Sequence, residues 1–194
     1  MQAFYRYAIS AMWLLWLLYW IAAALHAKPV RARESAASRL SHMVPLALGV
    51  VLFFANRLPI PWLNDRFLPR SIGWFWLAFW LTAVGIAFSV AARVWLGGNW
   101  SGTVTLKHNH ELIQTGPYGW VRHPIYTGLL LALLGSALAN GEWRGMLALV
   151  LITTAVLRRV RIEEAFLSRQ FGAAYGCYRE EVPSLLPLPR RRAL

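Results

Sequence analysis

Two long apolar segments dominate the pattern of hydrophobic and polar positions along the chain. Residues 4–27 carry one charge, Arg6, and residues 72–92 carry none. Each segment exceeds the ~20 residues with which a helix crosses a hydrocarbon core of about 30 Å. The first is too long for a signal peptide, has aromatic residues at its centre and lacks a clear small-residue cleavage site. The pattern predicts two membrane-spanning helices.

Three shorter apolar segments are also candidates for membrane-spanning helices. They cover residues 43–55, 124–139 and 143–157, and their 13 to 16 residues suit a buried helix as well as a membrane span. The last two are joined by the short connection 140–145, which forces an antiparallel hairpin. We therefore expect an all-α integral membrane protein with about five transmembrane helices.

The segment after residue 157 changes character. Ile162, Ala165, Phe166 and Phe171 are spaced among charged residues, which is the pattern of an amphipathic helix that continues the fifth span along the membrane interface. Pro183 is expected to end any helix at that point.

Composition agrees with a membrane protein, and the position of the charges gives its orientation. Of the 194 residues, 58% are apolar and 14% are charged, against about 25% charged in soluble domains. With five spans and the N-terminus outside, the inside segments 27–42, 93–123 and 158–194 hold fifteen of the twenty Lys and Arg residues. Such a bias fixes orientation and attracts anionic lipids. The net charge of +12 therefore indicates membrane lipids as partners rather than nucleic acid.

Polar residues gather at two places on the predicted inner side. One is the connection 93–123 with the start of the fourth span, and the other is residues 158–164. The hairpin brings these two places together, so that a mixed set of side chains meets beside the apolar phase: Arg122, His123, Tyr126, Arg158, Arg159, Glu163 and Glu164. Such a set is costly without a partner or ligand, which predicts a pocket at the membrane boundary.

Each of these residues also has a simpler interpretation. Pro124 fits the first turn of any helix, and aromatic residues such as Tyr118 and Tyr126 suit an interfacial belt. Glu163 and Glu164 have Arg159 and Arg161 as local partners. The single cysteine, Cys177, excludes an internal disulfide and a CxxC metal site, and no metal is expected.

Two motifs in this region resemble a known family. "HELIQTGPYGWVRHPIYTG" (110–128) and "RVRIEEAFLSRQFGAAYGCYREEVPSLLP" (159–187) share an Arg-His-Pro-x-Tyr box, a Glu-Glu pair and a proline-bearing end with the isoprenylcysteine carboxyl methyltransferases. The resemblance covers residues 95–188. It is less specific for the substrate, because phospholipid N-methyltransferases share the box and the pair, and some membrane sterol reductases have a comparable C-terminal region.

The resemblance implies S-adenosyl-L-methionine as cofactor and assigns roles to particular residues. Arg159 matches the arginine implicated with the substrate, and Glu164 or His123 is the candidate base if the acceptor is an amine or thiol. A glutamine of the eukaryotic members has no clear match, since Thr103 or Thr105 stands there. The implied cofactor contacts are His110, Glu111, Leu112, Ile113, Tyr118, His123, Pro124, Ile125, Tyr126 and Glu163.

The function predicted from the sequence is a membrane methyltransferase that O-methylates a lipophilic small-molecule or prenylated acceptor, such as an isoprenylcysteine. The alternatives are a phospholipid N-methyltransferase, an NADPH-dependent sterol-type reductase and a non-catalytic membrane carrier. We expect N-terminal transmembrane helices in residues 1–92, a methyltransferase core with a cytosolic cofactor-binding loop in 93–188 and a basic tail in 189–194. Eighteen arginines against two lysines favour a GC-rich bacterial source, and hence a bacterial inner membrane with the C-terminus in the cytoplasm.

Overall fold

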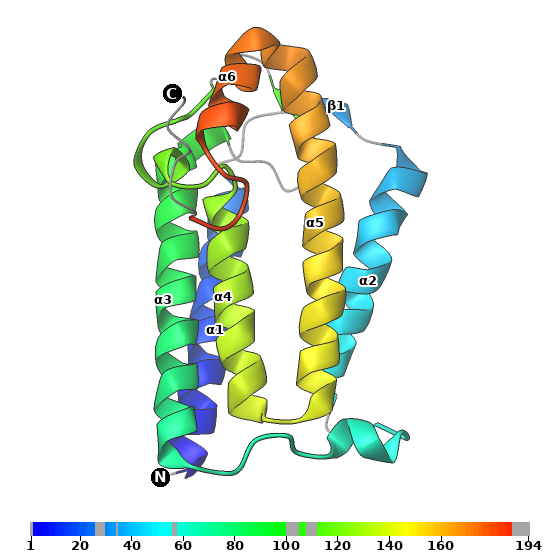
Figure 1. Cartoon of the computed structure of the whole chain (residues 1–194), viewed down its shortest axis with the longest axis vertical. Coiled ribbons are helices and arrows are strands. Elements are labelled where there is room, and N and C mark those ends of the chain that lie inside the picture. The colour runs from blue at the N-terminus through cyan, green and yellow to red at the C-terminus, as the bar shows by residue number, and fades with distance from the viewer. Residues whose placement is uncertain are drawn as a thin grey trace.

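The computed structural model describes residues 2–25, 30–33, 35–55, 58–99, 105–107 and 112–187. Five long helices in this part of the chain form an upright bundle in which successive helices alternate in direction (Figure 1). They are α1 (Gln2–Ala24), α2 (Ala36–Phe54), α3 (Ile72–Leu96), α4 (Pro124–Asn140) and α5 (Trp143–Phe171). The expectation of an all-α membrane protein with about five helices is confirmed.

Within the part of the chain that the structure describes, three helices are long and apolar enough to cross a membrane: Tyr7–Ala24, Ala36–Phe54 and Ile72–Leu96. Helix α2 reaches this length because it begins seven residues before the expected start, where the Ser35 hydroxyl caps it by accepting from the N–H of Ser38. Helix α4 is apolar but shorter, with 17 residues.

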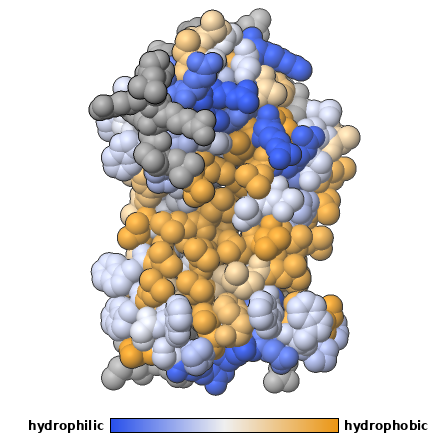
Figure 2. Space-filling view, viewed as in Figure 1, coloured by the Kyte–Doolittle hydropathy of each residue, from blue (hydrophilic) through white to orange (hydrophobic). Residues whose placement is uncertain are grey.

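The surface of the bundle exposes many apolar side chains, as expected of a protein in lipid. Apolar residues form a band across the middle of the face in Figure 2, and polar residues gather above it. Large apolar side chains are exposed on several helices, among them Leu15, Leu18, Val51, Trp80, Val84 and Val150. A water-soluble monomer rarely exposes so large an apolar area, so this band marks the part in contact with hydrocarbon.

Small residues let α3 and α4 approach closely. A Cβ atom on Gly85 would lie 2.4 Å from the backbone nitrogen of Ala132, and one on Gly128 would lie 2.5 Å from the carbonyl oxygen of Gly85. In lipid the hydrophobic effect does not drive helices together, because the acyl chains are as apolar as the helix surfaces. Close packing of backbones, as at these glycines, holds the helices together instead. Helix α4, which carries the Arg-His-Pro box at its start, is thus fixed against α3.

Helix α1 is joined to this pair by hydrogen bonds from its tryptophans. The indole of Trp13 donates to Ser136 of α4 at 2.9 Å, and the indole of Trp16 donates to Ser89 of α3 at 3.3 Å. The buried Arg93 near the end of α3 donates to the carbonyl of Ala23, near the end of α1, at 2.9 Å.

The hairpin between α4 and α5 forms as expected. Gly141, at a φ of 66°, ends α4, and α5 begins at Trp143. Helix α5 then continues without a break to Phe171, which confirms that the amphipathic segment extends the fifth apolar segment. Gly172, at a φ of 52°, turns the chain into α6 (Ala173–Glu181), which ends before Pro183.

Short elements complete the end of the bundle where the basic segments lie. The strands β1 (Val30–Arg33) and β2 (Thr105–Lys107) pair antiparallel and join the two basic connections, a pairing that the hydropathy pattern did not predict. The 3-10 helix η3 (Gly116–Gly119) leads into α4, and η2 (Gly97–Asn99) follows α3. A further 3-10 helix, η1 (Pro61–Asn64), lies in the connection between α2 and α3 at the opposite end (Figure 1).

We expect the variant Gly85→Leu to destabilise the protein by at least about 1–3 kcal/mol, since its side chain must push the backbone of α4 away from α3. Thermal unfolding in detergent micelles measures the effect. Gly73→Leu is the matched control, because a Cβ atom at Gly73 meets no atom within 4 Å. Equal unfolding temperatures for the two variants would contradict the close packing of α3 on α4.

Candidate functional site

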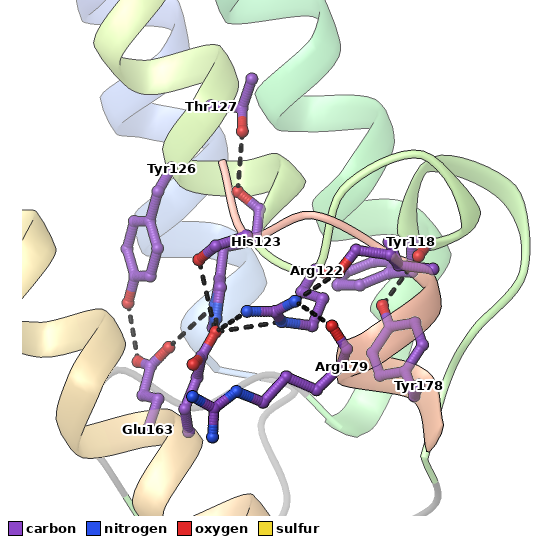
Figure 3. Close-up of polar contacts among 11 residues, drawn as sticks. Tyr118, Arg122, His123, Tyr126, Thr127, Glu163, Tyr178 and Arg179 are labelled. Carbon is purple, nitrogen blue, oxygen red and sulfur yellow. Dashed lines mark hydrogen bonds and ion pairs between the residues drawn. The ribbon is translucent and has the colours of Figure 1, made fainter. Parts of the chain in front are cut away.

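The start of α4 and the charged turns of α5 meet at the end of the bundle where α6 lies (Figure 1), and Figure 3 shows their polar side chains. His123 Nδ1 lies 3.6 Å from Glu163 Oε2, and His123 Nε2 lies 3.1 Å from Glu164 Oε1. The expectation that the hairpin brings His123 and Glu163 together is therefore confirmed. His123 is the residue directly before α4, and Pro124 at the first helical position loses no backbone hydrogen bond.

Glu164 is the centre of a dense set of contacts. Its Oε1 accepts from Arg122 Nε at 3.0 Å, from Arg122 Nη2 at 2.8 Å and from the Ser184 hydroxyl at 3.3 Å. Burial by itself raises the pKa of Glu164, but the hydrogen bonds from His123 and Arg122 and the charge of Arg122 lower that pKa to about 2. Glu164 is thus held as a carboxylate in a structural ion pair.

Arg122 also fastens the C-terminal segment, residues 182–187, to the start of α4. Its Nη1 donates to the carbonyl oxygens of Arg179 and Val182, and its backbone N–H donates to Pro183 at 2.9 Å. The next N–H, that of His123, donates to the carbonyl of Ser184 at 3.0 Å. The Thr127 hydroxyl donates to the carbonyl of Leu185 at 2.6 Å. The C-terminal segment therefore lies along the first turn of α4.

Glu163 has different neighbours, although it is adjacent to Glu164 in sequence. Its Oε1 accepts from the Tyr126 hydroxyl at 2.7 Å and from Arg159 Nε at 3.0 Å. The guanidinium of Arg159 also lies 5.9 Å from the centre of the Tyr126 ring. Burial alone lowers the pKa of Arg159, but Tyr126 and Glu163 outweigh burial and raise that pKa above its usual value.

The remaining candidate residues surround this centre to different degrees. Tyr118 is buried, donates to the carbonyl of Ala92 at 3.4 Å and accepts, at its own carbonyl, from the Tyr178 hydroxyl at 2.7 Å. Burial, and next the negative charge of Glu163, raise the pKa of Tyr118. Pro124 is fully buried, and Ile113 and Ile125 are half-buried.

Two residues depart from the simplest expectation, and two candidates cannot be placed. Leu112 packs against the cluster of Tyr175, Tyr178 and Val182 and so belongs to the core under α6. Arg158, expected beside the site, instead donates to the Ser41 hydroxyl of α2 at 3.2 Å. The candidates His110 and Glu111 lie outside the described residues.

Sequence reasoning missed the structural role of Arg122 and of the C-terminal segment. Both stood in the quoted motifs, as the first residue of the Arg-His-Pro box and as the proline-bearing end, but nothing indicated that they touch. A signal was present in the adjacency of Arg122 and His123 opposite two adjacent glutamates, since two neighbouring hydrogen-bond donors can pair with two neighbouring carboxylates.

The side chains around Glu163 include charged and aromatic groups that differ in exposure. The side chains of Glu163 and Arg159 are each 22% exposed, so both can reach a ligand, whereas His123 is 6% exposed. The rings of His123 and Tyr126 stack with their centres 5.9 Å apart. Among the described residues, no group of His, Cys, Asp or Glu side chains is arranged to hold a metal ion.

Comparison with known proteins identifies the class. Residues 74–174, just over half of the chain, match the model of the phospholipid methyltransferase family. This range contains most of α3 and all of α4 and α5, including the Arg-His-Pro box and both glutamates. The chain belongs to this family of membrane methyltransferases, and within it the resemblance to the isoprenylcysteine carboxyl methyltransferases is confirmed by the relatives.

The chain is 37% identical over 101 residues to the protein-S-isoprenylcysteine O-methyltransferase of Schizosaccharomyces pombe, covering 50% of this chain and 43% of the relative. It is 24% identical over 172 residues to the probable protein-S-isoprenylcysteine O-methyltransferase of Oryza sativa subsp. indica, covering 87% of each. It is also 23% identical over 142 residues to a steroid 5-alpha-reductase of Solanum lycopersicum, covering 71% of this chain and 55% of that protein. The chain thus spans less than half of the fission yeast relative and most of the rice one.

The ion pair of Glu164 predicts a pH-dependent stability. The folded protein keeps this carboxylate charged down to a pKa of about 2, whereas an unfolded chain takes up the proton near 4.5, so stability is lost as the pH falls from about 4.5 toward 2. Other carboxylates titrate in the same window. The measurement is therefore the difference between the wild type and Glu164→Gln in unfolding temperature from pH 6 to pH 2.

We expect the wild type to lose more stability across this range than Glu164→Gln, whose amide does not titrate. Parallel curves for the two proteins would show that Glu164 has an ordinary proton affinity in the folded state.

Proposed function

We propose that the protein is an S-adenosyl-L-methionine-dependent methyltransferase that O-methylates the carboxylate of a lipophilic, isoprenylcysteine-like acceptor. The observation that carries the proposal is the convergence of Tyr126, His123 and Arg159 on Glu163, beside a helix start and next to lipid-facing helices. Family membership supports methyl transfer, and the names of the fission yeast and rice relatives support this acceptor.

The residues present fit the cofactor's groups. Glu163 has one oxygen, Oε2, 3.6 Å from His123 Nδ1 and is partly exposed, so that it can accept from an ammonium or from ribose hydroxyls. The N–H groups in the first turn of α4 favour an anion such as the carboxylate of a methionine moiety. Tyr126 presents a phenol ring that suits adenine or a sulfonium cation. We assign the cofactor to these residues together with Tyr118, Pro124 and Ile125, and with Leu112 and Ile113 at its edge.

S-adenosyl-L-methionine supplies an electrophilic methyl group when bound. The protein's contribution is to align the acceptor oxygen with that methyl and to exclude water, and such orientation can supply about 7–11 kcal/mol. Arg159 holds the acceptor carboxylate by charge-assisted hydrogen bonds. Glu163 holds Arg159 in place by accepting a hydrogen bond from the Arg159 Nε at 3.0 Å.

A carboxylate acceptor suits this site better than an amine or a thiol. A carboxylate is already a nucleophile and needs no general base, whereas an amine or thiol must lose a proton. Glu164 is a weak base, because its pKa is lowered to about 2 by His123 and Arg122 against the effect of burial. In our proposal Glu164 therefore positions Arg122 and His123, and His123 is the base that an amine acceptor would require.

The molecule's setting in the membrane follows from the same geometry. The proposed site lies at the end of the bundle that carries the basic segments, and we place that end on the cytoplasmic side of a bacterial inner membrane, with the N-terminus outside. A lipid-tailed acceptor then enters sideways between helices while the soluble cofactor enters from the cytoplasm. We retain residues 93–188 as the part that carries the chemistry and residues 1–92 as its membrane scaffold.

A direct test uses the full chain purified in detergent, a cofactor labelled in its methyl group and N-acetyl-S-farnesylcysteine as acceptor. We expect transfer of label to the acid as a base-labile ester. Label that appears only in phosphatidylethanolamine would replace this proposal with phospholipid N-methylation, which the family description favours. Oxidation of NADPH with an enone sterol, in the absence of methyl transfer, would replace it with the reductase activity named for the tomato relative.

The residue assignments predict a split between binding and turnover. Glu163→Ala and His123→Ala should each weaken cofactor binding at least about tenfold, because Glu163 is the partner of the ligand and His123 holds Glu163 in place. Arg159→Ala should retain cofactor binding and lose turnover. Calorimetry for the cofactor and initial rates for the acceptor measure the two effects.

Arg161→Ala is the matched control for Arg159→Ala, since Arg161 is two residues along α5 and exposed. It should leave both measurements unchanged. Loss of cofactor affinity in Arg159→Ala, or unchanged affinity in both Glu163→Ala and His123→Ala, would overturn the assignment of roles.

A further inference from the structure

Arg122 is the first residue of the Arg-His-Pro box, and it is not among the implied cofactor contacts. Its guanidinium donates from Nε and Nη2 to one oxygen of Glu164, at 3.0 and 2.8 Å. His123 Nε2 lies 3.1 Å from that same Oε1 (Figure 3). Arg122 and the His123 ring therefore share one carboxylate oxygen, so the state of Glu164 links the two side chains.

The ionisation of Glu164 decides which nitrogen of His123 carries the proton. Burial raises the pKa of this carboxyl, but hydrogen bonds from His123 and Arg122 and the charge of Arg122 bring it down to about 2. An ionised carboxylate only accepts hydrogen bonds, so the contact requires a proton on His123 Nε2. A neutral imidazole has a single N–H, and its Nδ1 is then an acceptor.

His123 Nδ1 faces the second glutamate. It lies 3.6 Å from Glu163 Oε2, and with the proton on Nε2 both atoms are acceptors, so His123 supports Glu163 by contact rather than by a hydrogen bond. The other oxygen of Glu163 accepts from Tyr126 and Arg159. Within the described part of the chain, neither Nδ1 nor Oε2 has a hydrogen-bond donor. Two acceptors side by side suit a ligand group that donates, such as an ammonium or a ribose hydroxyl.

The charges of the cluster explain why His123 stays neutral. Arg122 pairs with Glu164 and Arg159 pairs with Glu163, so two cations balance two anions when the ring is uncharged. Without Arg122 one negative charge is left in excess at the boundary with lipid, which favours uptake of a proton from solvent. The proton goes to His123 or to Glu164, and a protonated Glu164 donates to Nε2. In both cases Nδ1 becomes a donor and satisfies Glu163 Oε2 internally.

We propose that Arg122 is a positioning residue that keeps the His123 proton on Nε2, so that Nδ1 and Glu163 Oε2 together accept hydrogen bonds from one donor group of the cofactor. Arg122 itself touches no ligand in this arrangement and acts through Glu164. The inference rests on the proposed function and deepens it, because it names the chemistry that His123 and Glu163 recognise.

The first measurement is a spectroscopic one that a merely structural role would not change. The full chain is prepared in detergent with isotope-labelled histidine, and the ring resonances show which nitrogen carries a proton at about pH 7.5, above the ordinary pKa of imidazole. The signal that disappears in His123→Asn belongs to His123. We expect a proton on Nε2 alone in the wild type, a proton on Nδ1 in Arg122→Gln, and the wild-type state in Arg122→Lys, which keeps the cation.

The second measurement is the affinity for S-adenosyl-L-homocysteine by calorimetry. We expect Arg122→Gln to weaken binding about tenfold, because the ligand's donor finds its acceptors occupied, and Arg122→Lys to recover most of the affinity. Methylthioadenosine, which lacks the amino-acid part, identifies the donor. Weakening of both ligands indicates a ribose hydroxyl, and weakening of S-adenosyl-L-homocysteine alone indicates the ammonium.

Thr127→Val is the matched control, since Arg122 also holds the C-terminal segment. It removes the hydrogen bond from Thr127 to the carbonyl of Leu185 but no contact of the His123 ring, and should leave both measurements unchanged. A proton on Nδ1 in the wild type would overturn the proposal, even where Arg122→Gln fails to fold. So would weaker binding in Arg122→Gln with the proton still on Nε2 alone. A wild type with the expected ring state that binds no S-adenosyl compound would refute the proposed function instead.

Discussion

Two adjacent carboxylates on α5, Glu163 and Glu164, must both be compensated at the boundary between lipid and water, and the arrangement of the site depends on how this is done. Successive side chains on a helix point about 100° apart, so the two glutamates cannot share one set of partners. Glu164 turns toward Arg122 and the C-terminal segment, and Glu163 turns toward Tyr126 and Arg159. His123 lies between them and contacts both. The pair is thereby divided into a structural carboxylate and one that is open to a ligand.

The ion pair of Glu164 with Arg122 keeps the site in its shape. Removing one partner of a buried ion pair leaves an uncompensated charge and costs about 3–5 kcal/mol, so Arg122 and Glu164 depend on each other. Through Arg122 the same pair holds residues 182–187 against the first turn of α4. Helix α4 is itself fixed by the close contact of Gly85 and Gly128 with backbone across the α3–α4 interface. A site made of long, flexible side chains is thus built on helices that have little freedom to move.

Much of this was predictable from local rules, and the rest depended on distant packing. A six-residue connection between apolar segments was enough to predict that His123 meets Glu163, because a tight hairpin allows one antiparallel arrangement. The different hydrogen-bond partners of Arg158 and Arg159 were not predictable, since the two residues are adjacent and chemically alike. Which one faces the site and which reaches Ser41 is decided by where α2 packs on α5, at Gly49 and Ile152. The pairing of β1 with β2 likewise joins residues about 75 positions apart that carry no strong strand pattern.

The position of α2 bears on how one family serves different acceptors. The family match contains most of α3 and all of α4 and α5, and α4 and α5 supply the polar groups around Glu163. A shared methyl donor requires those groups to stay alike, whereas the acceptor must be recognised by something that can differ. Helix α2 touches α5 along the turn that carries Arg159 and lies outside the matched range. The polar contacts of Glu163 therefore lie within the part that the family model matches, whereas the choice between Arg158 and Arg159 is made by a helix outside that part, because Ser41 of α2 accepts from Arg158 and leaves Arg159 to Glu163.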